Sequence, residues 1–345
     1  MQSYAQSLLQ DFEKYQSDYK KFSYCLSCSN AANKVIDFDY SSRVLVFDST
    51  ALSETDRIFL VSPSIFNSPD ILLISSPDDL ITNLRMFGKV YMVEWKEVTR
   101  QDHTLDNYAI SLSKILLQIQ QHHNKNIDII GHCIGGNIAI AANILAKHQA
   151  NSITLLSTPW DFSFLKAPKK IYDELDLEKT IESIETVPAL YFQILFFLMN
   201  PSSFEQKIGY YKHKASNMNI EKFFAVERWQ SSGIDLPKAL YKQLMNSFID
   251  KNIMLNNEWK IDGVTIDPSL INSPTLLIIG TKDNIVPPES SNALPILKPH
   301  ITKFSYDTGH IGYLVGSQKK KFILELNSWI KNMESKYERS LHYAC

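Results

Sequence analysis

Short apolar segments alternate with longer helical patterns along most of this chain, and this alternation constrains the fold more than any other feature. The helical patterns cover 104–123, 134–148 and 318–334. The apolar segments, rich in Val, Ile and Leu, are 34–38, 43–48, 57–62, 90–95, 127–131, 152–157, 275–280 and 302–307. Because strands buried on both faces are apolar throughout, the alternation predicts a parallel sheet with helices on both sides.

The alternation stops between Ser157 and Pro274, where the chain becomes mostly helical and rich in aromatic residues. Open α/β sheets bind their ligands at the carboxyl ends of the strands, so we expect this insertion to lie over that edge as a cap. The first residues have a helical pattern of apolar side chains (Leu8, Leu9, Phe12, Tyr15 and Tyr19). The expected parts are an N-terminal helical segment (1–30), an α/β core (31–157 and 274–335), a helical cap (158–273) and a C-terminal tail (336–345).

Composition excludes several classes of protein. The 345 residues include 35 Lys and Arg against 37 Asp and Glu, so the net charge of −2 indicates no nucleic-acid partner and no polybasic membrane surface. The chain begins without the basic and apolar regions of a secretory signal. Its most apolar segment, 187–199, is too short for a transmembrane helix and is interrupted by Pro188 and Gln193.

The cysteines and the nucleotide motifs give further expectations. Four cysteines in a chain of this length predict no disulfide framework and a reducing, cytoplasmic location. Cys25 and Cys28 have the spacing of a metal or redox pair, but no second pair accompanies them, so their role stays open. Because the chain has no phosphate-binding glycine loop, we expect neither a nucleotide cofactor nor a metal.

Glycine is rare, and its distribution points to chemistry. Six of the 11 glycines lie in the segments 131–136 and 309–316. The first segment, Gly-His-Cys-Ile-Gly-Gly, joins an apolar strand to an apolar helix, which is the context of the nucleophile elbow G-x-S-x-G with Cys133 in place of serine. Such a turn exposes the sulfur and directs the N–H of Ile134 toward a developing oxyanion, while the helix N-terminus and a nearby imidazole would favour the thiolate. The alternative is a small buried cysteine in a turn that merely needs glycines.

The rest of the chain supplies the partners of a nucleophile. In the α/β-hydrolase fold an acid and then a base follow the nucleophile along the chain, each in a loop after a late strand. Asp283 follows the strand predicted at 275–280, and His310 follows the one at 302–307. We therefore predict the catalytic residues Cys133, Asp283 and His310 on an α/β-hydrolase fold, a mostly parallel sheet with a helical cap insertion.

A second oxyanion donor is expected in the loop after the strand at 57–62. The candidate N–H groups lie between Ser64 and Asn67, with Ser64 and Ile65 first among them. Together with the N–H of Ile134, one of these groups would complete an oxyanion hole.

Several motifs together resemble the polyhydroxyalkanoate synthases, over about residues 30–332. They are GHCIGG at 131–136, SIFNSPDILL at 64–73, TPWDF at 158–162, NIEKFFAVERW at 219–229, IGTKDNIVPP at 279–288 and GHIGYLVGS at 309–317. The chain length and short N-terminal part are most similar to the small catalytic subunit of the two-component (class III) synthases. The chain departs from the family pattern at His132, Asn284 and Thr308, none of which is a predicted catalytic residue.

The resemblance implies an acyltransferase that polymerises 3-hydroxyacyl-CoA, with 3-hydroxybutyryl-CoA as the expected substrate. Cys133 would accept the acyl group as CoA leaves, and His310 would take the thiol proton. Asp283 is implied to help deprotonate the 3-hydroxyl that attacks the acyl-enzyme, whereas in an ordinary triad it would only orient His310. The alternatives are a cysteine-dependent thioesterase or esterase on the same fold and a granule-binding protein that has lost activity.

The resemblance also implies partners: the growing polyester, a second copy of the chain or a non-catalytic accessory subunit, and the surface of a polymer granule. Water would hydrolyse an acyl-enzyme, so we expect the cap to cover Cys133 with apolar side chains. We also expect 187–199 to present an exposed apolar surface to a partner or the granule. The aromatic side chains of the cap that we expect to exclude water are Tyr191, Phe192, Phe196, Phe197, Phe223, Phe224 and Trp229.

Overall fold

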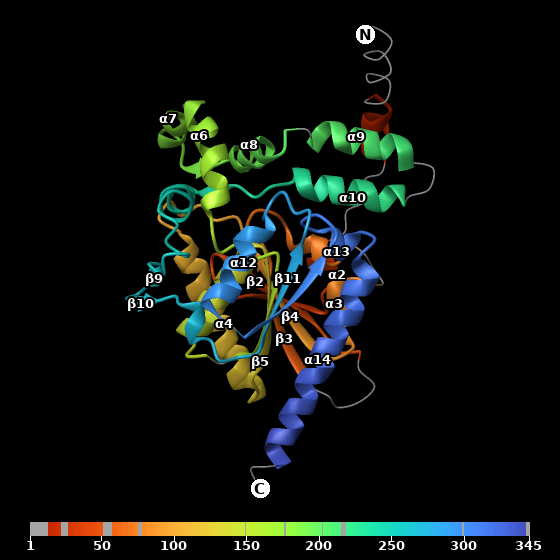
Figure 1. The fold of residues 1–345 in the computed structure, drawn as a ribbon, viewed down its shortest axis with the longest axis vertical. Coiled ribbons are helices and arrows are strands. Elements are labelled where there is room, and N and C mark those ends of the chain that lie inside the picture. The colour runs from red at the N-terminus through yellow and green to blue at the C-terminus, as the bar shows by residue number, and fades with distance from the viewer. Residues whose placement is uncertain are drawn as a thin grey trace.

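An eight-stranded sheet forms the centre of the molecule, with strand order β1-β2-β4-β3-β5-β6-β11-β12 (Figure 1). The computed structural model describes residues 13–21, 27–50, 57–74, 78–148, 150–175, 177–201, 203–214, 219–298 and 300–342. The pairs β1–β2 and β2–β4 are antiparallel and the other neighbours are parallel. The strands are β1 (Lys34–Asp37), β2 (Ser42–Phe47), β3 (Arg57–Ser62), β4 (Gly88–Trp95), β5 (Ile127–His132), β6 (Ala150–Leu156), β11 (Thr275–Gly280) and β12 (Ile301–Tyr306).

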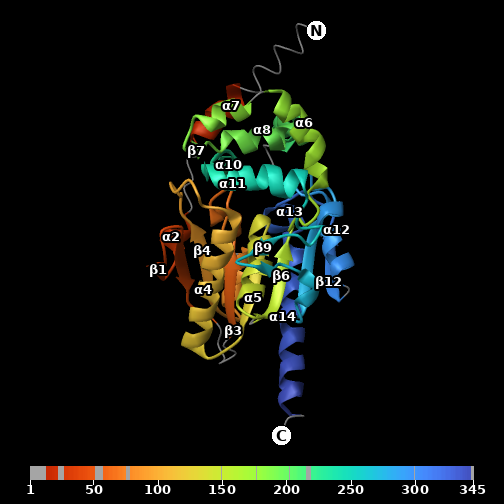
Figure 2. The same ribbon diagram turned by 90° about the vertical axis from the view of Figure 1, so that its left-hand side faces the viewer.

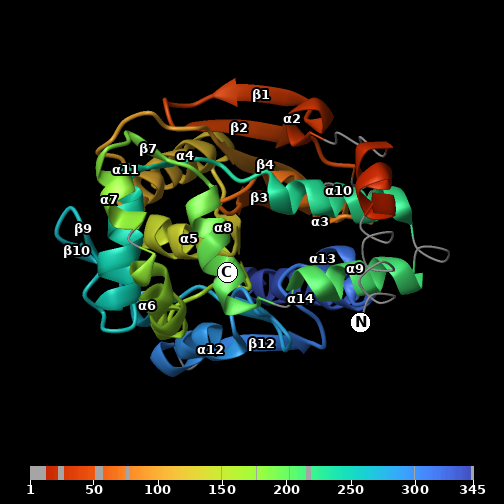
Figure 3. The same cartoon turned by 90° about the horizontal axis from the view of Figure 1, so that it is seen from above.

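Helices cover both faces of the sheet (Figure 3), which explains why the strands are apolar throughout. One face packs against α4 (Leu105–His123), α5 (Ile134–Leu145) and α12 (Pro288–Leu297), and the other against α3 (Leu80–Arg85) and α14 (Lys319–His342). Along β3, Ile58 and Leu60 enter the first core whereas Phe59 and Val61 enter the second. The mostly parallel sheet predicted from the sequence is confirmed.

The helices between β6 and β11 lie above the sheet, and we call this region the cap (Figure 2). Two short antiparallel strand pairs lie among these helices. The boundaries expected for the cap and the core stay a prediction. The cap elements are α6 (Lys166–Glu174), α7 (Leu177–Glu182), β7 (Thr186–Val187), α8 (Leu190–Met199), α9 (Ser203–Lys214), α10 (Ile220–Ser231), β8 (Leu236–Pro237), α11 (Lys238–Lys242), the π-helix η3 (Gln243–Asp250), β9 (Lys260–Ile261) and β10 (Val264–Thr265).

The two ends of the described chain differ in what they contact. Residues 13–21 form a helix that packs on the cap, where the buried Tyr15 hydroxyl donates to Glu227 Oε2 of α10 at 2.6 Å. Leu8, Leu9 and Phe12 lie outside the described residues.

The final helix runs to His342 rather than ending at 334, and the expected tail from 336 is therefore helical as far as this residue.

The segment 187–199 is exposed on one side only. Leu190 and Phe197 of α8 are 58% and 49% exposed, whereas Phe192 and Leu195 are buried in the cap core. The expectation of an exposed apolar surface is therefore right for one side of α8 and wrong for the other. Within the described ranges, no helix is both long and apolar enough to cross a bilayer.

Candidate active site

Cys133 lies on a sharp turn between β5 and α5. Its backbone has φ 55° and ψ −130°, a conformation that residues with side chains rarely adopt. A Cβ on Gly131 would lie 2.4 Å from the Cα of Gly136, and one on Gly135 would lie 2.2 Å from the carbonyl oxygen of Ser62. The helix therefore passes the strand so closely that these positions accept only glycine, which is the elbow geometry that the motif predicts.

The structure brings the three predicted catalytic residues together. His310, in the loop after β12, has its Nδ1 2.7 Å from Asp283 Oδ2. Asp283 Oδ1 accepts the N–H groups of Ile285 and Val286, both at 2.8 Å, which fix the carboxylate in its loop. The sulfur of Cys133 is close enough to His310 to raise the pKa of its imidazole, and because Nδ1 faces the carboxylate, Nε2 is the nitrogen left for the sulfur. The three side chains thus follow one another in the order carboxylate, imidazole and thiol.

Burial and charge act in opposite directions on His310. The Asp283 side chain is 1% exposed and that of His310 is 12% exposed. Burial by itself would lower the pKa of His310, but the facing carboxylate of Asp283 and the sulfur of Cys133 hold that pKa well above its ordinary value. The raised pKa favours the protonated form of His310, and a positive charge beside a cysteine sulfur favours a thiolate.

The three residues predicted to supply oxyanion donors differ in where they lie relative to Cys133. Ile134 is the first residue of α5, where backbone N–H groups have no acceptor within the helix. Ser64 lines the same cavity as Cys133 and His310. The side chain of Ile65 instead packs in the core and is 1% exposed. The roles of Ile134, Ser64 and Ile65 in an oxyanion hole stay a prediction.

A second histidine lies beside the catalytic one. His132, the last residue of β5, is 1% exposed, and its ring centroid lies 5.6 Å from that of His310. Within the described part of the chain, neither ring nitrogen has a hydrogen-bond partner. Burial, reinforced by the charge of His310, lowers the pKa of His132 to about 3. His132 is thus neutral, a property that its position in the motif did not reveal.

Two polar side chains close to His310 were also not predicted from the sequence. Tyr313 of α13 (Gly312–Val315) donates a hydrogen bond to Ser157 Oγ at 3.0 Å. Ser157 has φ 47° and lies within 3.5 Å of the His310 carbonyl oxygen. No sequence signal predicts this placement, because only the fold brings the serine after β6 and the tyrosine of α13 close to His310.

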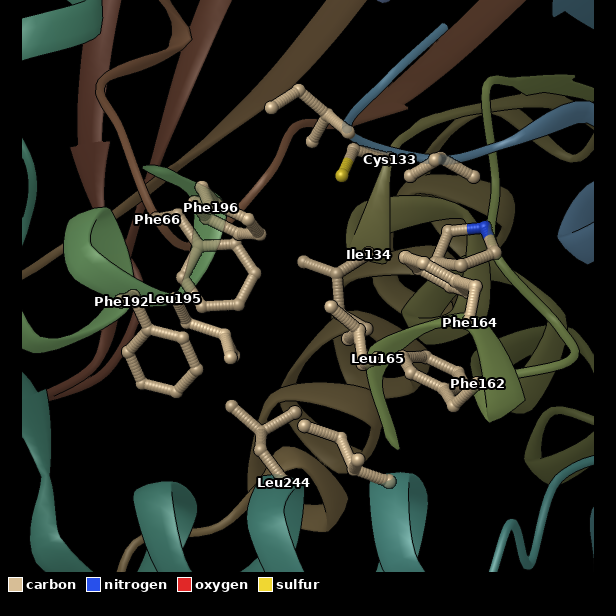
Figure 4. A pocket seen from close by; sticks show the side chains of 14 residues that line it. Phe66, Cys133, Ile134, Phe162, Phe164, Leu165, Phe192, Leu195, Phe196 and Leu244 are labelled. Atoms are coloured by element: carbon tan, nitrogen blue, oxygen red, sulfur yellow. The ribbon is translucent and has the colours of Figure 1, made fainter. Parts of the chain in front are cut away.

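Cys133 lies where two cavities meet. A narrow cavity of about 40 Å³ extends from the sulfur between the sheet edge and the cap, and apart from Cys133 its lining residues are apolar (Figure 4). A wide cavity of about 890 Å³ also reaches Cys133 and contains polar groups, among them Ser64, Asn67 and His310. Cys133 itself is only 7% exposed. The cap therefore covers the nucleophile as expected, with Phe162, Phe164, Leu165, Phe192, Leu195, Phe196 and Leu244 around the narrow cavity.

Comparison with known proteins identifies the fold. A family model described as the alpha/beta hydrolase fold matches residues 89–317, well over half of the chain. The chain belongs to the α/β hydrolase fold family. Among solved structures, this α/β hydrolase is similar to the esterase RhEst1 from Rhodococcus sp. ECU1013, with a TM-score of 0.55 and 10% identity over 87% of this chain and 98% of that one. A thermophilic esterase from Thermogutta terrifontis has a TM-score of 0.51 and 12% identity over 87% and 98% of the two chains. At these identities the similarity shows the fold alone.

Curated relatives of this α/β hydrolase confirm the resemblance to polyhydroxyalkanoate synthases. The poly(3-hydroxyalkanoate) polymerase subunit PhaC of Haloferax mediterranei is 25% identical over 314 residues, which are 85% of this chain and 62% of that protein. The PhaC of Allochromatium vinosum is 23% identical over 285 residues, 79% of each protein. The chain spans only 62% of the length of the relatives from Haloferax mediterranei and Haloarcula marismortui.

Proposed function

We propose that this protein is a polyhydroxyalkanoate synthase that takes 3-hydroxyacyl groups from CoA thioesters and polymerises them through an acyl-Cys133 intermediate. The observation that carries the proposal is the arrangement of Asp283, His310 and Cys133 beneath the cap, where a narrow apolar cavity and a wide cavity with polar groups both reach Cys133. The similarity to PhaC proteins supports the choice of substrate.

In the first step the thiolate of Cys133 attacks the thioester carbonyl carbon. The negative charge that develops on the carbonyl oxygen is stabilised by the N–H of Ile134 and a backbone N–H between Ser64 and Asn67. The bond between this carbon and the CoA sulfur then breaks, and the leaving thiolate takes the proton from His310. One thioester replaces another, so the step is nearly balanced in free energy and leaves His310 neutral.

In the second step a 3-hydroxyl group attacks the acyl-Cys133 carbonyl carbon. Neutral His310 takes the hydroxyl proton, an ester bond forms, and the bond to the Cys133 sulfur breaks. Cys133 leaves as a thiolate and His310 is again protonated, so the site returns to its starting state. No external acid, base or cofactor is needed in either step.

Asp283 acts through His310 in this mechanism. One carboxylate oxygen accepts two loop N–H groups and the other faces Nδ1 of His310. The side chain is also 1% exposed. An incoming hydroxyl would therefore meet His310 first, which favours the orienting role of an ordinary triad over direct deprotonation by the carboxylate.

The proposal includes assembly at the polymer. A homodimer or a non-catalytic accessory subunit, and attachment to a granule surface, would cover the exposed side of α8. Leu190 and Phe197 are large apolar side chains on that side, and neighbouring apolar side chains of this kind mark interaction surfaces.

Release of CoA from 3-hydroxybutyryl-CoA, with and without an accessory subunit, tests the function. We expect polyester as the product and a loss of CoA release on the order of 10⁴-fold or more in Cys133→Ala. Cys28→Ala is the matched control, because Cys28 is a buried free cysteine outside both cavities and should retain activity. Free 3-hydroxybutyrate as the main product would identify a thioesterase instead. CoA release at the normal rate in Cys133→Ala would contradict the assignment of the nucleophile.

A further inference from the structure

The two cavities at Cys133 differ in what they can bind. The described residues around the narrow cavity offer no polar side chain except the Cys133 sulfur. Ser64, Asn67, Asn284 and His310 lie in the wide cavity. A 3-hydroxyacyl group on the sulfur has an apolar branch and a hydroxyl on the same carbon. Because burying an unpaired hydroxyl is costly, the branch belongs in the narrow cavity and the hydroxyl in the wide one.

The far end of the narrow cavity is formed by a π-helix. Cys133 and Leu244 lie at opposite ends of this cavity in Figure 4. Leu244 and Ile249 both line it, and both belong to the π-helix Gln243–Asp250. Hydrogen bonds in a π-helix join residues five apart, so Leu244 and Ile249 lie on the same side of it. Such segments are rare and are frequently found at functional sites.

The π-helix is fixed to the core at its first residue. The Gln243 side chain accepts the N–H of Leu105 at 2.8 Å and donates to Asp106 Oδ1 at 2.9 Å, both at the start of α4. Trp259 Nε1 donates to the same carboxylate oxygen at 2.8 Å, and its ring packs edge-on against Phe248 of the π-helix. These contacts hold the end of the cavity in place, so its length is a fixed property of the site.

The volume of the cavity limits the group that fits. The cavity has only about 40 Å³, so the side chains at its far end restrict how long a group can extend from the sulfur. We propose that Leu244 and Ile249 set the length of the acyl branch and that the preferred substrates are 3-hydroxyacyl thioesters with a short branch. The substrate class rests on the proposed function, whereas the role of the two side chains can be tested without it.

A turnover experiment compares 3-hydroxybutyryl-CoA, 3-hydroxyhexanoyl-CoA and 3-hydroxyoctanoyl-CoA, whose branches contain one, three and five carbons. We expect Leu244→Ala to raise the octanoyl-to-butyryl ratio of kcat/KM at least about tenfold. Leu240→Ala is the matched control: Leu240 is equally buried on the adjoining helix α11 but lies outside the cavity lining. It removes the same carbon atoms and should leave the ratio unchanged.

A second readout needs no turnover. N-alkyl iodoacetamides with chains of one, three and five carbons label Cys133 when the thiolate displaces iodide and forms a new S–C bond. Intact-mass spectrometry gives the rates, and Cys133→Ala identifies labelling of other cysteines. We expect the five-carbon reagent to label Leu244→Ala at least about five times faster than it labels the wild type or Leu240→Ala.

The two readouts separate the possible failures. A labelling shift specific to Leu244→Ala, without CoA release from any thioester, would support the role of the π-helix and contradict the proposed function. Identical length profiles in Leu244→Ala, Leu240→Ala and the wild type would overturn the inference even if the protein makes polyester.

Discussion

Replacing Asp283 by asparagine tests how the catalytic residues divide their work. Asp283 Oδ1 accepts two loop N–H groups at 2.8 Å, and Oδ2 faces His310 Nδ1 at 2.7 Å. In Asp283→Asn only the amide oxygen can accept the loop N–H groups, so the NH₂ group must turn toward His310. Two donors cannot pair, and the imidazole must therefore carry its proton on Nε2, on the side of Cys133.

The size of the effect follows from this change of tautomer. An imidazole with its proton on the wrong nitrogen cannot accept one from the nucleophile or the incoming hydroxyl. The same substitution in a serine-protease triad costs on the order of 10⁴ in kcat, or about 5.4 kcal/mol of activation free energy. The loss of a hydrogen bond to a charged group costs only about 1.5–3 kcal/mol of folding stability. We therefore expect a folded variant whose acylation is slower by about 10³- to 10⁴-fold.

The assay is a single-turnover reaction with 3-hydroxybutyryl-CoA, in which quenched samples are analysed for acyl-Cys133 by intact mass and for free CoA. Asp307→Asn is the matched control, because it removes a nearby exposed carboxylate that pairs with Lys282. Elongation is measured separately by adding thioester to preformed acyl-enzyme. If Asp283→Asn acylates at the wild-type rate and slows only in elongation, the carboxylate acts directly on the hydroxyl and our reasoning is refuted.

Two further predictions concern stability. Gly135→Ala should lower the free energy of unfolding by at least about 3 kcal/mol, because the new Cβ would lie 2.2 Å from a backbone oxygen. The control Gly209→Ala, with open space around it in α9, should be neutral or stabilising by up to about 1 kcal/mol. Equal urea midpoints for the two variants would contradict the close packing at the elbow. Because burial lowers the pKa of His132 to about 3 from an ordinary 6.5, unfolding takes up a proton below pH 6.5, and stability should fall with decreasing pH by up to about 1.4 kcal/mol per unit. His132→Phe should remove this part of the slope in urea unfolding between pH 7 and 5, and an unchanged slope would show that His132 is not buried as a neutral group.

The sequence predicts that Cys133, Asp283 and His310 lie together, because the signals for their positions are local. Cys133 is marked by glycines that the strand-to-helix turn requires. Asp283 and His310 are marked by their places directly after β11 and β12. Parallel strands bring their carboxyl ends to one edge, so three separate local patterns suffice to predict one site.

Other features depend on contacts between distant residues and could not be predicted. The segment QLMNSFID has an ordinary helical pattern, and nothing in it predicts a π-helix held by the contact of Gln243 with Asp106. The docking of Tyr15 on Glu227 joins residues 212 positions apart. His132 is neutral because the fold surrounds it, and its sequence position alone is equally compatible with a charged residue. Tertiary structure decides each of these properties.

In the mechanism that we propose, the cavities rather than the three proposed catalytic residues would decide between polymerisation and hydrolysis. Both reactions share the acyl-cysteine and differ only in whether water or a 3-hydroxyl attacks it. The wide cavity of about 890 Å³ is large enough for tens of water molecules, so covering Cys133 with the cap does not by itself keep water away. We infer that the acyl chain, CoA or polyester must fill the wide cavity to exclude water. In this view the narrow cavity selects the monomer, and the occupant of the wide cavity protects the thioester until the hydroxyl arrives.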